Sequence, residues 1–236
     1  MWRWIGLVVV ALAAGGVLFL LRHPVNSGMV RAGLIGCLGV LGTAGLVALW
    51  RWRKWSVGLA ALLVIPVVLP GRAPDARRMR RDFVERVRAM EGTRYVWGGE
   101  SLRGVDCSGL PRRSMRGALL AEGLRGNGRG WRGWVDDWWY DASARALGEG
   151  YRGRTAATGI EGVLRRLDPA LLEPGDLAVT DGGVHVLVYL GDGEWAQADP
   201  GEGRVVVSHP AEDPNPWFEN RVTMHRWVLL SGQEPG

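Results

Sequence analysis

Two side chains in this 236-residue sequence could together carry out nucleophilic chemistry. Cys107 is one of two cysteines, and it lies in a polar, glycine-rich loop at the start of a predicted helix that runs to about Leu124. A helix N-terminus carries a partial positive charge and unpaired N–H groups, which favour a thiolate and can hold a developing oxyanion. Cys107 is therefore a candidate nucleophile, although a lone cysteine at a helix start is more often a small packed side chain.

His185 is the candidate general base. It opens an apolar strand directly after a glycine turn, in Asp-Gly-Gly-Val-His-Val-Leu-Val-Tyr-Leu-Gly-Asp-Gly. A strand end gives an imidazole a rigid position from which it can face a neighbouring helix. Gln197 lies on the next predicted strand, where a hairpin would bring its amide carbonyl to His185. His209 and His225 are rival partners, which we expect instead at the surface and in the core.

The elements that must position these groups follow from hydrophobic spacing. Apolar residues at helical intervals predict an amphipathic helix over Asp75 to Met90. Short β-like runs separated by Gly, Asp and Pro predict a small antiparallel sheet, with strands at Leu177–Thr180, His185–Leu190, Glu194–Ala198, Arg204–Val207 and Val222–Leu230. Helices followed by strands indicate an α+β domain with the cysteine-bearing helix packed on the sheet.

Four sequence blocks occur in an order that resembles a known family. They are Tyr95-Val-Trp-Gly-Gly-Glu-Ser, Gly104-Val-Asp-Cys-Ser-Gly-Leu, Pro174-Gly-Asp-Leu and the segment from His185. Together they look like the signature blocks of the NlpC family of bacterial cell-wall cysteine peptidases, over roughly residues 79–230. The resemblance implies a papain-like α+β fold that cleaves the peptide stems of peptidoglycan, without a metal or organic cofactor.

The resemblance also implies roles for particular residues. It makes Cys107 the nucleophile, His185 the base and Gln197 the polar third residue, a position commonly held by His in the family. It further suggests Tyr95 near the thiol, and Asp106 and Ser108 near the substrate.

Two features depart from the family pattern. The interval between Cys107 and His185 is longer than the family leads us to expect, and the extra length falls in a stretch at about 125–158 that is rich in Gly and Trp and fits neither a helix nor a strand pattern well. Pro111 also interrupts the helix after the cysteine and is tolerated only near its first turn. The stretch includes four tryptophans that could form a lid or a sugar-stacking platform, or could pack in the core or at a membrane interface: Trp131, Trp134, Trp138 and Trp139.

The first 70 residues predict a membrane anchor. Ile5–Leu21 and Ala32–Trp50 are long enough to span a bilayer, whereas Val57–Leu69 is marginal. We therefore expect two or three transmembrane helices in residues 1–70, in contact with membrane lipids, and a peptidase domain in residues 71–236. The second run has a glycine at every third position, either as a ridge for another helix or by chance of composition: Gly33, Gly36, Gly39, Gly42 and Gly45.

The net charge of +5 does not indicate a nucleic-acid partner. Residues 1–82 hold 11 Lys+Arg and 2 Asp+Glu, and the remaining residues hold 18 and 22, so the basic excess flanks the apolar runs. The charge pattern alone does not orient the anchor. An extracytoplasmic peptidase is expected because peptidoglycan lies outside the membrane. The alternatives are an amidase or lipid acyltransferase with the same Cys-His site on the inner face, and a non-catalytic wall-binding scaffold.

Overall fold

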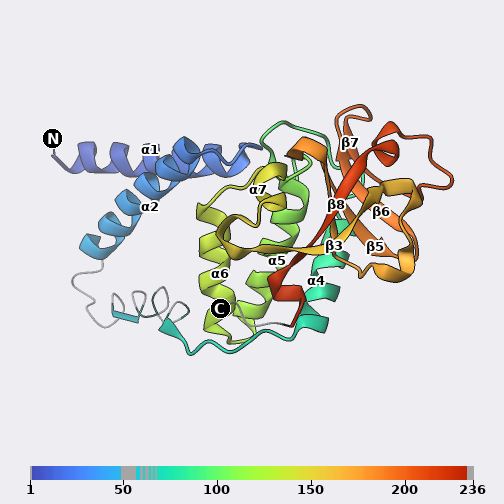
Figure 1. Cartoon of the computed structure of the whole chain (residues 1–236). Coiled ribbons are helices and arrows are strands. Elements are labelled where there is room, and N and C mark those ends of the chain that lie inside the picture. The colour runs from blue at the N-terminus through green and yellow to red at the C-terminus, as the bar shows by residue number, and fades with distance from the viewer. Residues whose placement is uncertain are drawn as a thin grey trace.

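The computed structural model describes residues 2–48 and 68–232, and between them positions 57, 58, 61, 64 and 66. The expected third apolar run therefore lies largely outside the described residues, as do the tryptophans and basic residues at 50–55. Two N-terminal helices, α1 (Trp2–Arg22) and α2 (Gly28–Ala48), project from the rest of the molecule (Figure 1). Each contains an apolar stretch long enough to cross a membrane, and only 6% of each stretch is buried.

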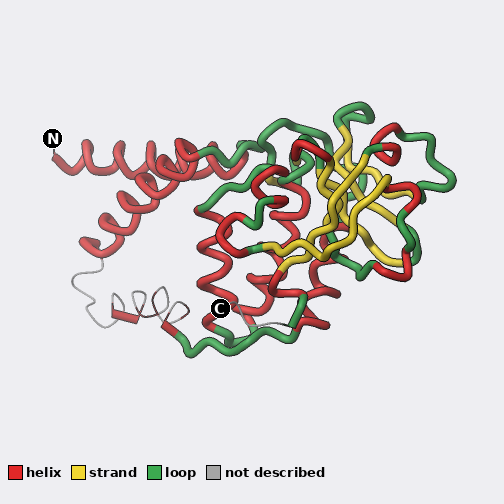
Figure 2. Tube along the Cα trace, viewed as in Figure 1, coloured by secondary structure: helices red, strands yellow, loops and turns green. Residues whose placement is uncertain are grey.

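The domain that follows has a helical half and a strand half (Figure 2). Its helices are α4 (Ala76–Arg88), α5 (Gly109–Leu124), α6 (Gly128–Trp139) and α7 (Ala144–Gly148). The α4 helix begins where the Asp75 side chain accepts a hydrogen bond from the Arg78 N–H, and it buries Met79, Phe83 and Val87. The α5 helix accommodates Pro111 because this residue lies in the first turn, where a backbone N–H has no intrahelical partner.

The strands form a hairpin and a six-stranded sheet. The hairpin pairs β1 (Glu100–Ser101) with β2 (Gly104–Val105) just before the cysteine. The sheet has the order β3-β8-β4-β5-β6-β7, and all its pairs are antiparallel. Its strands are β3 (Thr155–Val163), β4 (Leu177–Thr180), β5 (Val186–Gly191), β6 (Glu194–Asp199), β7 (Arg204–Ser208) and β8 (Arg221–Trp227). The α+β class expected from the sequence is confirmed.

The central strands are buried on both faces. In β5, Val186, Val188 and Leu190 pack against the helices, whereas Leu187 and Tyr189 face a second cluster with Trp195 on the opposite side. Short 3₁₀ segments cover that side, among them η3 (Leu164–Arg166) and η6 (Pro216–Glu219). Two-sided burial explains why this strand reads as a continuous apolar run.

The stretch at 125–158 is ordered, contrary to its irregular pattern in the sequence. It contains α6, α7, the 3₁₀ turn η2 (Tyr151–Gly153) and the start of β3, a strand that the sequence pattern did not predict. Glycine obscured the helix because it lowers helix propensity, but here it permits close packing. A Cβ on Gly130 would lie 2.5 Å from the Gly123 nitrogen of α5, so the two helix backbones meet directly.

The glycine ridge of α2 is only partly covered. A Cβ on Gly33 would touch Leu20 of α1, whereas Gly36 and Gly39 line an open groove between the two helices. A helix partner for the ridge stays a prediction.

Phe83 provides a test of the packing between α4 and the rest of the domain. Its ring is fully buried and lies edge-on to Trp227 at 6.3 Å between centroids. Phe83→Ala should lower the free energy of unfolding by about 3–5 kcal/mol, the usual cost of removing a core phenylalanine. The measurement is denaturant unfolding of the full chain in detergent, with Leu124→Ala, at an exposed position of α5, as the matched control. Equal midpoints for the two variants would contradict this packing.

Candidate active site

The Asp106 carboxylate holds the loop that carries Cys107. Its Oδ2 accepts a hydrogen bond from the Gly98 N–H at 2.8 Å, and its Oδ1 accepts from the Gly109 N–H at 2.6 Å and from the Ser108 hydroxyl at 3.0 Å. Gly109 is required sterically, because a Cβ there would lie 2.0 Å from the carbonyl oxygen of Gly99. These contacts fix Cys107 one residue before Ser108, the N-cap of α5.

The Cys107 thiol is pressed against the first residues of β5. Its Sγ lies 3.9 Å from the carbonyl oxygen of Val184, to which the thiol donates, and the side chain is 8% exposed. Burial raises the pKa of the thiol to about 11, and the charge of Asp106 adds to this effect. The backbone N–H groups of Val186, Ser108 and Cys107 itself act in the opposite direction on this pKa, because they stabilise the thiolate. The peptide groups on both sides of His185 thus contact the sulfur.

The His185 imidazole is buried and oriented by Gln197. The His185 Nε2 lies 2.8 Å from the Gln197 Oε1, which can only accept, so Nε2 carries the proton and Nδ1 keeps its lone pair. Burial lowers the pKa of His185 to about 4, although the Gln197 hydrogen bond and the charge of Asp199 act to raise it. At neutral pH the resting site therefore holds a neutral thiol and a neutral imidazole.

Strand β6 also holds in place a ring that stacks on the imidazole, that of Trp217. The Trp217 ring stacks on His185, with centroids 4.0 Å apart and planes 18° from parallel. Trp217 is held by Asn215, whose Oδ1 accepts from the Trp217 N–H at 3.0 Å and whose Nδ2 donates to Asp199 at 2.5 Å. Gln197 and Asp199, two residues apart on the same face of β6, therefore fix the ring edge and the ring face of His185.

Tyr95 lies close to the thiol. Burial raises the pKa of its phenol to about 12, with further contributions from the charges of Cys107 and Asp106. The hydroxyl consequently stays protonated and can donate a hydrogen bond. Asp106 and Ser108 also lie beside Cys107, but the contacts they make bind them to each other and to the loop. Their contact with substrate stays a prediction.

A cavity of about 430 Å³ opens in front of Cys107. Its walls include the exposed Trp97 and, besides Asp106, three charged residues, Glu100, Arg112 and Asp141. Arg112 is buried and forms ion pairs with both carboxylates, and burial lowers its pKa to about 10. The cavity is therefore a polar groove with a network of paired charges on one wall.

The rival histidines lie where the sequence placed them. His209 is partly exposed at the end of β7 and faces Glu194 at 3.7 Å, and His225 is buried on β8. The tryptophans of α6 do not belong to the cavity lining, which draws on Trp97 instead. Among the residues that the structure describes, no group of three or more His, Cys, Asp and Glu side chains could hold a metal ion.

Sequence reasoning missed Trp217 and Trp97. Trp217 reaches His185 from a 3₁₀ turn more than 30 positions later, and no spacing rule connects them. Trp97 stands inside the first signature block, between Tyr95 and the glycines, and this position was a usable signal; the structure shows that its ring is exposed.

The NlpC/P60 family model matches residues 92–225, which is more than half of the chain, and the chain belongs to this family. No curated protein matches the chain.

Three solved structures illustrate the likeness. The peptidoglycan hydrolase RipB from Mycobacterium tuberculosis is 24% identical, with 64% of this chain and 65% of that chain covered and a TM-score of 0.39. An NlpC/P60 family protein from Bacillus cereus is 23% identical, covering 67% and 41%, with a TM-score of 0.40. The NlpC/P60 domain of the peptidoglycan hydrolase SagA is 23% identical, covering 61% and 96%, with a TM-score of 0.36. The chain thus spans less than two thirds of the length of the first two.

The thiol pKa leads to a test by alkylation. In a Cys37→Ser chain, the rate of reaction of Cys107 with iodoacetamide should be low at pH 7 and should rise close to tenfold per pH unit up to about pH 10, because the thiolate fraction grows with pH below a pKa of about 11. Mass spectrometry of the labelled peptide gives the rate, with Cys107→Ala as the background. A rate that is already constant between pH 6 and 9 would mean a resting thiolate and contradict the neutral pair.

Proposed function

We propose that the chain is a membrane-anchored thiol peptidase that cleaves amide bonds in peptidoglycan stem peptides. The observation that carries the proposal is the placement of Cys107 at the start of α5, against the peptide groups on either side of His185, with Gln197 orienting the imidazole. Membership of the NlpC/P60 family supports the same chemistry, and the family resemblance supplies the substrate class.

The proposed reaction starts from the neutral pair. As the Cys107 sulfur attacks the scissile carbonyl, His185 Nδ1 takes the thiol proton, so no free thiolate has to form first. The Cys107 and Ser108 N–H groups and the Tyr95 hydroxyl lie near the sulfur and are our candidate donors for the oxyanion. The imidazolium then protonates the leaving amine as the C–N bond breaks, and water hydrolyses the thioester with His185 again as base.

The polar cavity suits a substrate with charged groups. Stem peptides carry free carboxylates and amines, and Glu100, Arg112 and Asp141 offer both signs of charge along one wall. These three residues are our candidates for substrate discrimination, together with the exposed face of Trp97.

We further propose that the catalytic domain lies outside the cytoplasm. The turn between α1 and α2 contacts the domain, since Val25 pairs with Gly99 as an isolated β-bridge. If α2 spans the bilayer, its end at Ala48 lies on the other face, together with the N-terminus. The sequence places four basic residues on that face, which the positive-inside rule assigns to the cytoplasm: Arg3, Arg51, Arg53 and Lys54. The domain itself can be translocated despite the basic residues after Pro70, because long domains cross largely regardless of charge.

Catalysis is tested with purified muropeptides. His185→Ala should reduce the rate of amine release by roughly 10²–10⁴-fold, the usual contribution of a general base, and Cys107→Ala should abolish it. The matched control is His225→Ala, which removes a buried imidazole that we place outside the site. Chromatography of the products measures the rate. A folded wild-type chain that releases no new amine would refute the peptidase proposal, and loss of activity only with His225→Ala would reassign the base.

The side of the membrane is tested by labelling intact cells. Leu171 is exposed on η4 (Pro169–Leu171), so Leu171→Cys in a Cys37→Ser, Cys107→Ala chain should react with a membrane-impermeant maleimide added outside cells whose outer layers are permeable to it. The parent without Leu171→Cys gives the background. Labelling only after the cytoplasmic membrane is opened would place the domain inside and favour the amidase or acyltransferase alternative.

A further inference from the structure

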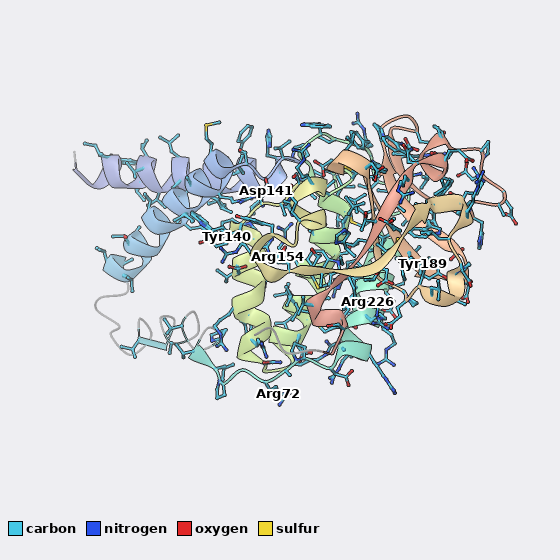
Figure 3. All side chains as sticks on the ribbon, viewed as in Figure 1. Arg72, Tyr140, Asp141, Arg154, Tyr189 and Arg226 are labelled. Carbon is cyan, nitrogen blue, oxygen red and sulfur yellow. The ribbon has the colours of Figure 1, made fainter. Side chains whose placement is uncertain are left out.

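Helix α6 is tied at both ends to chain that borders an apolar segment. Figure 1 shows it at the edge of the domain that faces α1 and α2, with its axis running across that of α1. Figure 3 shows Tyr140 and Asp141 near one end of this helix and Arg72 near the other. The contacts at these two ends define how the helix lies relative to the anchor.

At its C-terminal end, α6 is held by the first turn of α2. The Arg31 guanidinium donates to the carbonyl oxygen of Trp139, lies 3.7 Å from the Asp141 carboxylate, and donates to the carbonyl of Asn26 at 2.7 Å. Asn26 in turn donates to Glu100 at 3.1 Å. Arg31 is only 4% exposed, whereas most of the apolar residues after it in α2 are not buried by protein. Arg31 therefore marks the level at which α2 leaves the domain.

At its N-terminal end, α6 is held by the segment that follows the third apolar run. The Arg132 side chain donates to the carbonyl oxygen of Leu69 at 3.0 Å, and the Gly128 N–H donates to that of Pro70 at 3.1 Å. Asn127, the N-cap of α6, exchanges two hydrogen bonds with the backbone of Arg72, at 3.0 and 3.1 Å. The chain thus arrives from its apolar run directly at the start of α6.

The two faces of α6 differ sharply. Gly130 and Asp137 are buried against the domain, where Asp137 lies 3.3 Å from Arg154. Arg132, Val135 and Trp139 share the opposite face at intervals of three and four residues, and Val135 and Trp139 are 42% and 45% exposed. Arg132 and Trp139, at the two ends of this outer face, are the residues that contact Leu69 and Arg31. A valine and a tryptophan side by side, with an arginine at the edge of the patch, suit the interface between membrane and water, where indoles concentrate and long basic side chains reach the headgroups.

We propose that the outer face of α6, formed by Arg132, Val135 and Trp139, lies in the headgroup region of the lipid bilayer. The inference rests on α1 and α2 spanning that bilayer, as in the proposed function. A twelve-residue helix is about 18 Å long, and both its ends meet chain that directly precedes or follows an apolar segment, so its axis follows the plane of the membrane surface. The arginine suits lipid phosphates and the indole suits the interface.

This placement sets the distance between the active-site cavity and the membrane surface. Asp141, Ser143 and Ala144 follow α6 directly and line the cavity, and Glu100, which also lines it, is tied to the α1–α2 turn through Asn26. The cavity is therefore held beside the bilayer, where it meets peptides close to the membrane surface rather than deep in the wall.

Depth-dependent fluorescence quenching tests the proposal without using activity. The full chain with Cys37→Ser and Cys107→Ala, in nanodiscs of zwitterionic and anionic phospholipid, receives one bimane-labelled cysteine by Val135→Cys, Val40→Cys or Leu171→Cys. Val40 is exposed on α2 and reports the bilayer interior, and Leu171 reports the strand side of the domain. A lipid nitroxide at the headgroup should quench the label at 135 at least twofold more than the label at 171, and a nitroxide deep in the acyl chain should quench the label at 40 most.

Three results would overturn the proposal. Equal quenching at 135 and 171 by the headgroup nitroxide, with full access of both to aqueous iodide, would leave α6 in water. A label at 135 that is shielded from iodide yet unquenched by lipid would mean that protein, such as a second copy of the chain, covers this face. A label at 40 that lipid nitroxides do not quench would show that α2 does not cross the bilayer, and the proposal would lose its basis. None of these outcomes bears on thiol chemistry at Cys107, which muropeptide cleavage measures separately.

Discussion

The structure depends on one contact, the packing of the N-terminus of α5 against the start of β5. This contact places the Cys107 sulfur 3.9 Å from the Val184 carbonyl and within reach of the Val186 N–H. It also removes water, which raises the pKa of the thiol and lowers that of His185. Both charged forms are therefore disfavoured at rest, and in the proposed mechanism the charge separation arises only as the substrate carbonyl is attacked.

The rest of the domain holds this contact in place from two directions. From the helix side, Asp106 binds the loop before α5 through three hydrogen bonds, and Gly109 allows the close approach to Gly99. From the sheet side, β6 presents Gln197 to the imidazole edge and, through Asp199 and Asn215, holds Trp217 on its face. The sheet can be this rigid because its central strands are packed on both faces.

The charged network between the domain and the α1–α2 turn has a different role. Arg112, Arg31 and Asn26 connect Glu100 and Asp141, on the cavity wall, to the turn between the two apolar helices. Burying so many charges is costly unless they are paired, and here each carboxylate meets at least one guanidinium. The network therefore joins the cavity wall to the turn between α1 and α2, so that in the proposed arrangement the position of the membrane also sets the position of the site.

The sequence by itself determined the local parts of this protein. The spacing of hydrophobic residues predicted α4 and five of the six strands of the sheet. The length and apolarity of the first two runs predicted α1 and α2. The ordered blocks around Tyr95, Cys107 and His185 predicted the NlpC-type domain. The role of Gln197 could be predicted from the sequence because only a hairpin turn separates it from His185 along the chain. The tertiary structure alone decided that Trp217 stacks on His185, that β3 pairs with β8, and that the glycine-rich stretch forms α6 against α5. Each of these depends on surfaces brought together from distant positions, where packing overrides the low intrinsic propensity of glycine and no periodicity records the partner.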